Sequence, residues 1–152
     1  MPSTFTLTSP AFANGGAIPR RHTCDVEDLS PALRWEGAPP GVAAYVLVVD
    51  DRDARGWIHW MVIDLPAGTS ELAEGLSPSG SGVPVQGRND FGRTGWGGPC
   101  PPPGSGDHRY VFTLHALSSA LGLGAGSSAA QVHAAAADRM IATASLEGTY
   151  RR

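Results

Sequence analysis

The chain has 152 residues and a formal net charge of −3, with 41% hydrophobic and 16% charged residues. These values fit a single folded domain over residues 1–152 and exclude a disordered chain. All 11 basic residues are arginines scattered along the sequence, so the basic stripe typical of nucleic-acid-binding proteins is missing. No apolar run approaches the ~20 residues of a membrane span. We therefore expect neither a nucleic acid partner nor a membrane-spanning segment.

Short strands separated by turns are predicted for the first two-thirds of the chain, where Gly and Pro recur. Residues 4–8 alternate between polar and apolar side chains and favour an opening strand. Residues 45–50 and 57–65 are apolar runs too short for helices, which is typical of strands buried on both faces. A short helix is expected near residues 70–75.

Two loops rich in Gly and small polar residues or Pro come next. Residues 77–84 predict a mobile loop, whereas three consecutive prolines make part of residues 95–106 stiff. Residues 109–117 form another apolar run and predict a strand. Both loops are flanked by segments of core character, so we expect no domain boundary here.

One clear helix is expected near the C-terminus. Ser128 and Gln131 fit a capping box, and residues 129–140 are rich in Ala, the best helix former. Residues 141–146 predict a last strand, although the helix could also continue through them. Many strands, one or two helices and no alternation of strand and helix favour a mostly β, antiparallel sandwich with peripheral helices.

Acidic residues follow the buried strand that ends at residue 50. Asp51 and Asp53 have two interpretations from the sequence. They are either solvated turn residues or carboxylates held near the sheet edge by hydrogen-bond donors.

His59 lies within the strand predicted over residues 57–65. With a period of two residues, alternate side chains occupy opposite faces of this strand. One face would carry Trp57, His59, Met61 and Ile63, and the other Ile58, Trp60 and Val62. Both faces are apolar, so we expect His59 to be buried, either as a core histidine bonded to a backbone carbonyl or as part of a site.

His108 and Tyr110 stand at the start of the strand predicted over residues 109–117 and point the same way, because they are two residues apart. An imidazole and a phenol side by side offer donors to a phosphate or carboxylate. The alternative is a histidine at a strand end beside a core tyrosine. The Gly-rich loop before them could line an anion site with backbone N–H groups, but no Gly-Lys-Ser/Thr follows, so it is no P-loop.

Five segments match the pattern of a known family in order. They are residues 14–24, 29–41, 50–60, 89–110 and 146–150. Through them nearly the whole chain resembles the bacterial branch of the phosphatidylethanolamine-binding protein family, which includes Raf kinase inhibitor protein. The resemblance implies a large central antiparallel sheet packed against a smaller one, with one or two peripheral helices. It also implies a pocket that accepts phosphate, acetate or a phospholipid headgroup.

The resemblance further implies which residues form that pocket. Its acidic, histidine and tyrosine positions are matched by Asp51, Asp53, His59, His108 and Tyr110. Gly98 and Pro99 match the loop at its rim. Arg52 and Arg55 depart from the family pattern, because they stand where the family has prolines. We therefore expect a pocket mouth that is more open and more positive than usual.

Binding of a small anionic ligand is the expected function, and other uses of the pocket remain open. In a small-molecule enzyme (a lyase, isomerase or cyclase), His59 or His108 would be the base and Tyr110 the acid, with Asp51 beside them. Cys100 is a weaker option as a nucleophile, and no hydrolase signature is present. Asp and His side chains could hold a divalent ion, but the resemblance implies no metal and no cofactor.

A regulatory role through a protein partner is a further option, since animal and plant members of the family act that way. The resemblance also suggests a homodimer. Trp35, Trp57 and Trp96 could serve an interface or the pocket rim, although ordinary core positions are the simpler interpretation.

The compartment expected from the N-terminus is the cytoplasm, because the first residues lack the pattern of a signal peptide. A mature form whose signal was removed is the alternative. In a reducing compartment Cys24 and Cys100 would stay thiols. Only the resemblance gives a reason to place them near each other.

Overall fold

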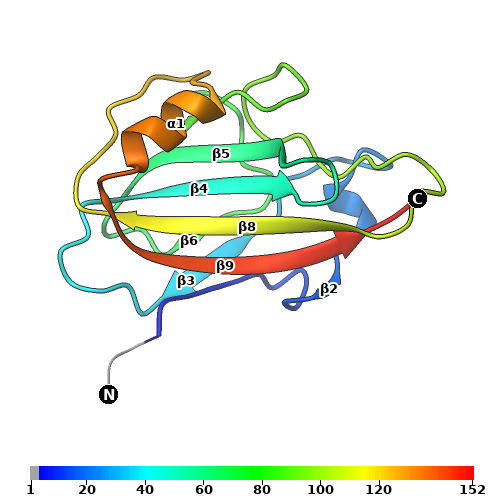
Figure 1. The fold of residues 1–152 in the computed structure, drawn as a ribbon, viewed down its shortest axis with the longest axis horizontal. Helices are drawn as coiled ribbons and strands as arrows, with labels where there is room; N and C mark the ends of the chain where they lie inside the picture. Colours follow the sequence, from blue (N-terminus) through cyan, green and yellow to red (C-terminus); the bar gives the residue numbers. More distant parts are fainter. Residues whose placement is uncertain (1–3) are drawn as a thin grey trace.

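The computed structural model describes residues 4–152, which form two layers of β-strands and a helix (Figure 1). A three-stranded sheet has the order β1-β3-β6, and a six-stranded sheet has the order β2-β9-β8-β4-β5-β7. The elements are β1 (Thr6–Thr8), β2 (Gly16–Ala17), the 3-10 helix η1 (Arg20–His22), β3 (Leu33–Glu36), β4 (Ala44–Asp51), β5 (Trp57–Pro66), β6 (Glu71–Leu72), β7 (Val85–Gln86), β8 (His108–Leu117), α1 (Ala129–Ala136) and β9 (Met140–Tyr150). The expected mostly β fold, with a large sheet on a smaller one, is confirmed.

The main hydrophobic core lies between the two sheets. Leu33 and Trp35 of β3 face the large sheet and are almost fully buried. The large sheet contributes Tyr45, Leu47, Val49, Trp60, Val62, Tyr110, Phe112, Leu114 and Leu146. Removing these side chains from water is the main force that holds the two layers together.

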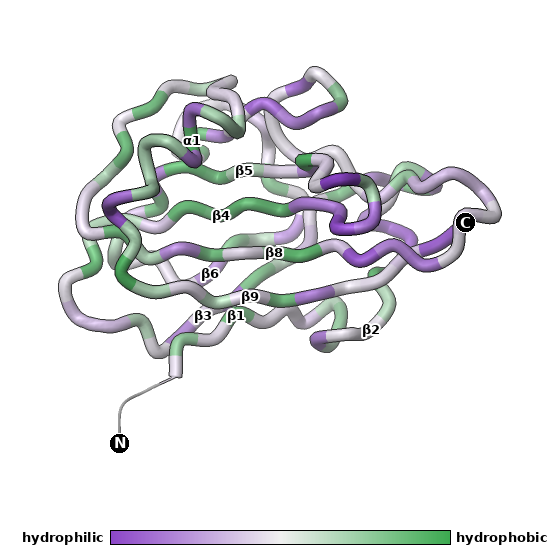
Figure 2. The backbone as a smooth tube through the Cα atoms, viewed as in Figure 1, coloured by the Kyte–Doolittle hydropathy of each residue, from purple (hydrophilic) through white to green (hydrophobic). Residues whose placement is uncertain are grey.

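A second, smaller core lies on the outer face of the large sheet, beneath α1. Val132 and Ala136 of the helix pack against residues of β4, β5 and β8, namely Val46, Val48, Ile58, Met61, Ile63 and Leu117. This helix explains why β4 and β5 are apolar on both faces, as expected. Strands β8 and β9 lie beyond the helix (Figure 2). The outer hollow over these strands is lined by polar residues such as Thr113 and Ser145.

A β-bulge in β5 changes the face on which His59 lies. Val49 of β4 pairs with Trp60, but the next residue, Asp50, pairs with Ile58, so His59 is an extra residue on β5. The His59 ring lies 5.1 Å from the ring of Tyr110, on the inner face of the sheet. The expected placement of His59 on the same face as Met61 and Ile63 is therefore wrong.

The short helix expected near residues 70–75 is also wrong. The segment forms β6, in which Leu72 pairs with Leu33 of β3. Leu72 is buried in the core between the sheets, and burial of this side chain explains why the segment is extended.

The C-terminal helix and strand are confirmed with shifted bounds. The Ser128 hydroxyl oxygen accepts from the backbone N–H of Gln131, and the Gln131 side-chain oxygen accepts from the backbone N–H of Ser128. These two bonds form the expected capping box. Helix α1 ends at Ala136, and the chain returns to the sheet as β9, which pairs with the whole of β8. Continuation of the helix through residues 141–146 is excluded by this pairing.

A disulfide joins Cys24 to Cys100, with 5.4 Å between the two Cα atoms. The sequence left open whether the two cysteines are bonded, and thiols were expected only in a reducing compartment; in this structure they are bonded. The loop after β7 folds back over the ends of β5 and β8, and the backbone N–H of Cys24 donates to the Pro99 carbonyl. The disulfide therefore ties the segment around η1 to the loop that precedes β8.

Within residues 4–152, no helix combines the length and the hydropathy required to cross a bilayer. The α-helix α1 has only 8 residues.

Candidate functional site

The end of the large sheet where β4 finishes and β5 and β8 begin carries a hollow of about 300 Å³. The three strands are neighbours and antiparallel, so Asp51 at the end of β4 pairs with Trp57 on one side and with Tyr110 on the other. Two loops complete the walls. The lining residues are Asp51, Ala54, Trp57, His59, Phe91, Cys100, Pro101, Pro102, His108 and Tyr110. The hollow thus brings together four of the residues expected at the site.

Asp51 and His108 form a buried pair at the base of this pocket. The Asp51 Oδ2 and His108 Nδ1 atoms lie 2.6 Å apart, and the side chains are 4% and 10% exposed. The Asp51 Oδ1 atom accepts from the backbone N–H of Asp53 at 2.8 Å. Both oxygens of the carboxylate are therefore occupied within the protein, which satisfies a carboxylate that burial would otherwise disfavour.

The number of protons shared by Asp51 and His108 follows from the hydrogen bonds that surround the pair. The Ser105 hydroxyl donates to the Pro102 carbonyl at 2.7 Å, because a carbonyl can only accept. Ser105 Oγ must then accept from His108 Nε2, which lies 3.1 Å away. A second proton lies between His108 Nδ1 and Asp51. The pair holds two protons and is neutral overall, whichever of the two atoms carries the second one.

His59 is held by two hydrogen bonds to one residue. Its Nδ1 atom lies 2.5 Å from the Gly97 carbonyl oxygen and must donate to it, and the Gly97 N–H donates to the His59 carbonyl at 2.9 Å. A Cβ atom at Gly97 would come within 2.6 Å of the Phe91 ring, so any larger residue there would have to displace that ring from the pocket wall. Burial lowers the pKa of His59, and the Gly97 bond and the Asp51 charge oppose that shift only in part. His59 is therefore neutral at pH 7, with the lone pair of Nε2 available.

Tyr110 places a hydroxyl group at the same base. The residue is 1% exposed, and its hydroxyl has no hydrogen-bond partner among residues 4–152. Burial first, and then the charge of Asp51 and the nearness of its side chain to the hydroxyl, raise the pKa of Tyr110 well above the ordinary range, so the phenol stays protonated. An unpaired buried donor is costly, and a ligand that accepted from it would remove this cost.

Asp53 lies outside the pocket. Its two carboxylate oxygens each lie 3.1 Å from a guanidinium nitrogen of Arg109, and Oδ2 also accepts from the Arg109 backbone at 2.7 Å. The bonds from the Arg109 side chain, and then its backbone, lower the pKa of Asp53. This carboxylate fixes the turn after β4 onto the start of β8.

Gly98 and Pro99 are buried behind the pocket wall. The Gly98 N–H donates to Asp28 Oδ1 at 2.9 Å, and a Cβ atom at Gly98 would come within 2.2 Å of that oxygen. The rim of the pocket is formed by the next residues along the loop. Cys100 is oxidised in the disulfide, so its use as a nucleophile is excluded in this state.

The two arginines that replace family prolines have specific backbone roles. The Arg52 N–H donates to the Arg109 carbonyl at 2.9 Å, a bond that proline could not make. Arg55 has a φ of 56°, which the proline ring does not allow. Neither side chain is among those that line the pocket.

Of the apolar walls of the pocket, only Trp57 had been considered for the rim from the sequence. Trp57 and Phe91 are each 40% exposed, and their rings meet edge to face at 5.6 Å. Ala54, Pro101 and Pro102 complete this apolar mouth. The run of prolines was visible in the sequence, but the turn that brings Phe91 over His59 was not. The other two tryptophans that we considered pack elsewhere: Trp35 is buried in the core, and Trp96 packs against it.

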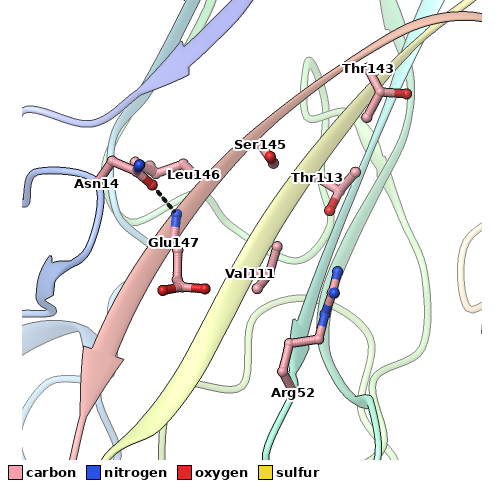
Figure 3. A pocket seen from close by; sticks show the side chains of 8 residues that line it. All are labelled: Asn14, Arg52, Val111, Thr113, Thr143, Ser145, Leu146 and Glu147. Carbon is pink, nitrogen blue, oxygen red and sulfur yellow. Dashed lines mark hydrogen bonds between the residues drawn. The ribbon is translucent and has the colours of Figure 1, made fainter.

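A larger hollow of about 510 Å³ lies on the opposite face of the large sheet, over β8 and β9 (Figure 3). It is lined by Asn14, Arg52, Val111, Thr113, Thr143, Ser145, Leu146 and Glu147. Arg52 pairs with Asp50 at 2.8 Å, and Asn14 accepts from the Glu147 backbone at 2.9 Å. Its side chains are mostly exposed or half-buried. Among residues 4–152, no group of three or more His, Cys, Asp or Glu is placed to hold a metal ion, in either hollow or elsewhere.

The family model for phosphatidylethanolamine-binding protein matches residues 8–151. The chain belongs to this family. A UPF0098 protein of Aquifex aeolicus is 46% identical over 149 residues, which cover 95% of this chain and 86% of the relative. A Mycobacterium tuberculosis relative named as a candidate lipoprotein, LppC, is 41% identical over 95% of this chain and 71% of its own length. The structure of Escherichia coli YbcL, described as a new member of the mammalian family, is similar with a TM-score of 0.91, 34% identity and coverage of 97% of this chain and 98% of YbcL.

Proposed function

We propose that the pocket between β4, β5 and β8 binds a small anionic ligand, such as phosphate, a carboxylate or a phospholipid headgroup. The observation that carries this proposal is the Tyr110 hydroxyl, a buried donor with no partner among residues 4–152 that lines the hollow. His59 lies beside it, with an edge-to-face distance of 5.1 Å between the rings. The family name supports the same class of ligand, because a phospholipid headgroup carries a phosphate.

The build of the pocket supports a ligand with a polar head and an apolar remainder. Asp51, His59, His108 and Tyr110 place polar atoms at the base, whereas Trp57 and the loop residues around it form apolar walls. Buried polar groups inside an apolar hollow are typical of small-molecule sites. A ligand anion would occupy the base, and its hydrocarbon part would contact the mouth.

Calorimetric titration with inorganic phosphate and with phosphoethanolamine tests the proposal. Tyr110→Phe removes only the hydroxyl, and we expect it to weaken binding about tenfold, the cost of one hydrogen bond to a charged group. His108→Ala disrupts the buried pair and should weaken binding further. Arg52→Ala, in the hollow on the other face, serves as the matched control and should bind as the wild type does. Equal heats in all four proteins would refute the proposal.

Acid–base catalysis on a small molecule is a second function that one observation favours. His59 offers a lone pair on Nε2, and Tyr110 offers a proton at the same base, so the pair could remove and deliver protons on one substrate. We regard binding without turnover as the better-supported function, because the family description names a bound ligand and no reaction. Product analysis after incubation with small phosphorylated or carboxylated compounds would show turnover if it occurs.

The cytoplasmic location, a regulatory role and the homodimer stay predictions. The Cys24–Cys100 disulfide favours an oxidising compartment instead, because thiols are kept reduced in the cytosol of most cells. Alkylation of the native protein in its source cells would decide this point: protected cysteines indicate the oxidised form. Light scattering on the purified chain would show whether it dimerises.

A further inference from the structure

The pocket offers few hydrogen-bonding groups that are not already bonded within the protein. These free groups determine how an anion can be bound. Both Asp51 oxygens are occupied, and both His108 nitrogens are bonded, to Asp51 and to Ser105. The Nδ1 atom of His59 is fixed on the Gly97 carbonyl. What remains free at the base is the Tyr110 hydroxyl and the His59 Nε2 atom.

Among the described residues that line this pocket, none carries a permanent positive charge that could balance an anion. None of the ten lining residues is an arginine, and the chain contains no lysine. Three arginines directly adjoin lining residues in the sequence. Arg109 pairs with Asp53 and Arg52 pairs with Asp50, and the exposed Arg55 is not among the residues that line the pocket. The Asp51–His108 pair is neutral overall. An anion entering the pocket would meet one O–H donor and, on the neighbouring imidazole, a lone pair that repels it.

We propose that the pocket binds its anion together with one proton, which His59 takes up on Nε2. This inference rests on the proposed anion-binding function and adds the protonation state in which the complex forms. Once protonated, the His59 ring donates to the Gly97 carbonyl through Nδ1 and to the anion through Nε2, while Tyr110 donates its hydroxyl proton. The anion gains a cationic partner that the empty pocket lacks.

The groups around His59 are consistent with such a proton site. From β4 it is faced by Asp51, from β8 by the Tyr110 phenol, and from the loops by the Phe91 ring and the Gly97 carbonyl. The charge of Asp28 also acts on it. Burial lowers the pKa of His59 in the empty pocket. A bound anion acts in the opposite direction, because a negative charge beside an imidazole favours its protonated form.

The sign of the pH dependence follows from this linkage. Below the pKa of His59 in the empty protein, the ring is already charged and the affinity is independent of pH. Above that pKa, binding must take up a proton, so the affinity falls about tenfold for each pH unit. Because the empty-state pKa lies below the ordinary value of 6.5, this decline should extend through neutral pH.

Sulfate is the best probe, because its charge does not change between about pH 5 and pH 8. Calorimetric titration of the full chain at several pH values, each in two buffers of different ionisation heat, yields both the affinity and the number of protons taken up. We expect about one proton per sulfate above neutral pH and the tenfold decline per unit. Phosphate serves as the second ligand, after correction for its own ionisation.

Two variants separate the role of His59 from general damage to the pocket. His59→Gln cannot take up a proton, and we expect weak binding, no proton uptake and a flat pH profile. Tyr110→Phe removes a donor that does not titrate in this range, so its affinity should fall while the slope and the proton uptake remain those of the wild type. Thermal unfolding shows whether His59→Gln still folds. As a measurement that needs no variant, the ¹⁵N signal of the His59 ring in the wild type should change to that of an imidazolium when sulfate is added.

The outcomes distinguish this inference from the function on which it rests. Sulfate or phosphate binding with a flat pH profile, or with the same proton uptake in His59→Gln, overturns the proton-coupled mechanism and leaves the anion site in place. If no anion binds at any pH, the proposed function fails and the inference fails with it.

Discussion

The two hollows at this end of the large sheet share neighbouring residues of β8 and of the end of β4, yet they differ in kind. Asp51 and Tyr110 point to the inner pocket, whereas Arg52 and Val111 line the outer hollow. In the inner pocket the Asp51 and His108 side chains are buried and hydrogen-bonded to each other. In the outer hollow the polar groups are mostly exposed to water. The difference shows that depth and burial, rather than size, distinguish the candidate site, because only buried polar groups are costly to leave unpaired.

The largest expected effect comes from the disulfide that ties the pocket wall to the segment around η1. Cys24 and Cys100 are 76 residues apart in the sequence, so replacing both by serine should lower the free energy of unfolding by about 4 kcal/mol. Urea denaturation measures this, and a reducing agent should have the same effect on the wild type. An unchanged midpoint in both experiments would show that the disulfide contributes nothing to stability.

Removal of the buried carboxylate should be nearly as damaging. Asp51→Ala leaves His108 without its partner at the base of the pocket, and we expect a loss of about 3 kcal/mol of unfolding free energy. Glu147→Ala, in the outer hollow, is the control and should change stability by no more than about 0.5 kcal/mol. Similar losses of unfolding free energy in the two variants would contradict the claim that the buried polar groups of the inner pocket matter more to stability than the exposed ones of the outer hollow.

The apolar mouth should affect only ligands with a hydrocarbon part. Trp57 is 40% exposed at the mouth, and its replacement by alanine removes apolar contact area from a bound alkyl chain. We expect Trp57→Ala to weaken binding of an alkyl phosphate about tenfold and to leave inorganic phosphate within about twofold. Calorimetry with both ligands tests this, and a uniform loss for both would place the tryptophan's effect at the base of the pocket instead.

The smallest effect is expected for Asp53, which lies outside both hollows. Arg109 lowers its folded-state pKa below 3.8. Its contribution to stability is therefore present above pH 3.8 and is lost as the pH falls through the folded-state pKa. NMR titration of the Asp53 side chain should show this low pKa in the wild type and an ordinary value in Arg109→Ala. An ordinary value in both proteins would mean that the pair does not persist in solution.

The sequence predicted the strands around the pocket because their apolar runs are continuous. Strands β4, β5 and β8 were all expected within a few residues of their bounds. A period of two residues cannot reveal the extra residue that a bulge inserts, so the face of His59 was predicted wrongly. Leu72 was assigned to a helix because its partner, Leu33, is distant in the sequence and is only found by pairing.

The site was predicted from the resemblance more than from residue patterns. Spacing along one strand placed His108 and Tyr110 together, and their common pocket with Asp51 and His59 depends on the order of three strands. No local signal shows that Asp53 pairs with Arg109 outside the pocket, or that Gly98 and Pro99 lie behind its wall. The disulfide was also beyond prediction, since the cysteines meet only when the loop before β8 folds back.

Titration with phosphate, followed by ¹H–¹⁵N NMR spectra of the whole chain, tests the central claim most directly. If the inner pocket binds the anion, the signals that move most should belong to His59, Gly97 and Tyr110, with those of Thr113 and Glu147 in the outer hollow unchanged. Shifts centred on the outer hollow, or no saturable shifts at all, would contradict the account.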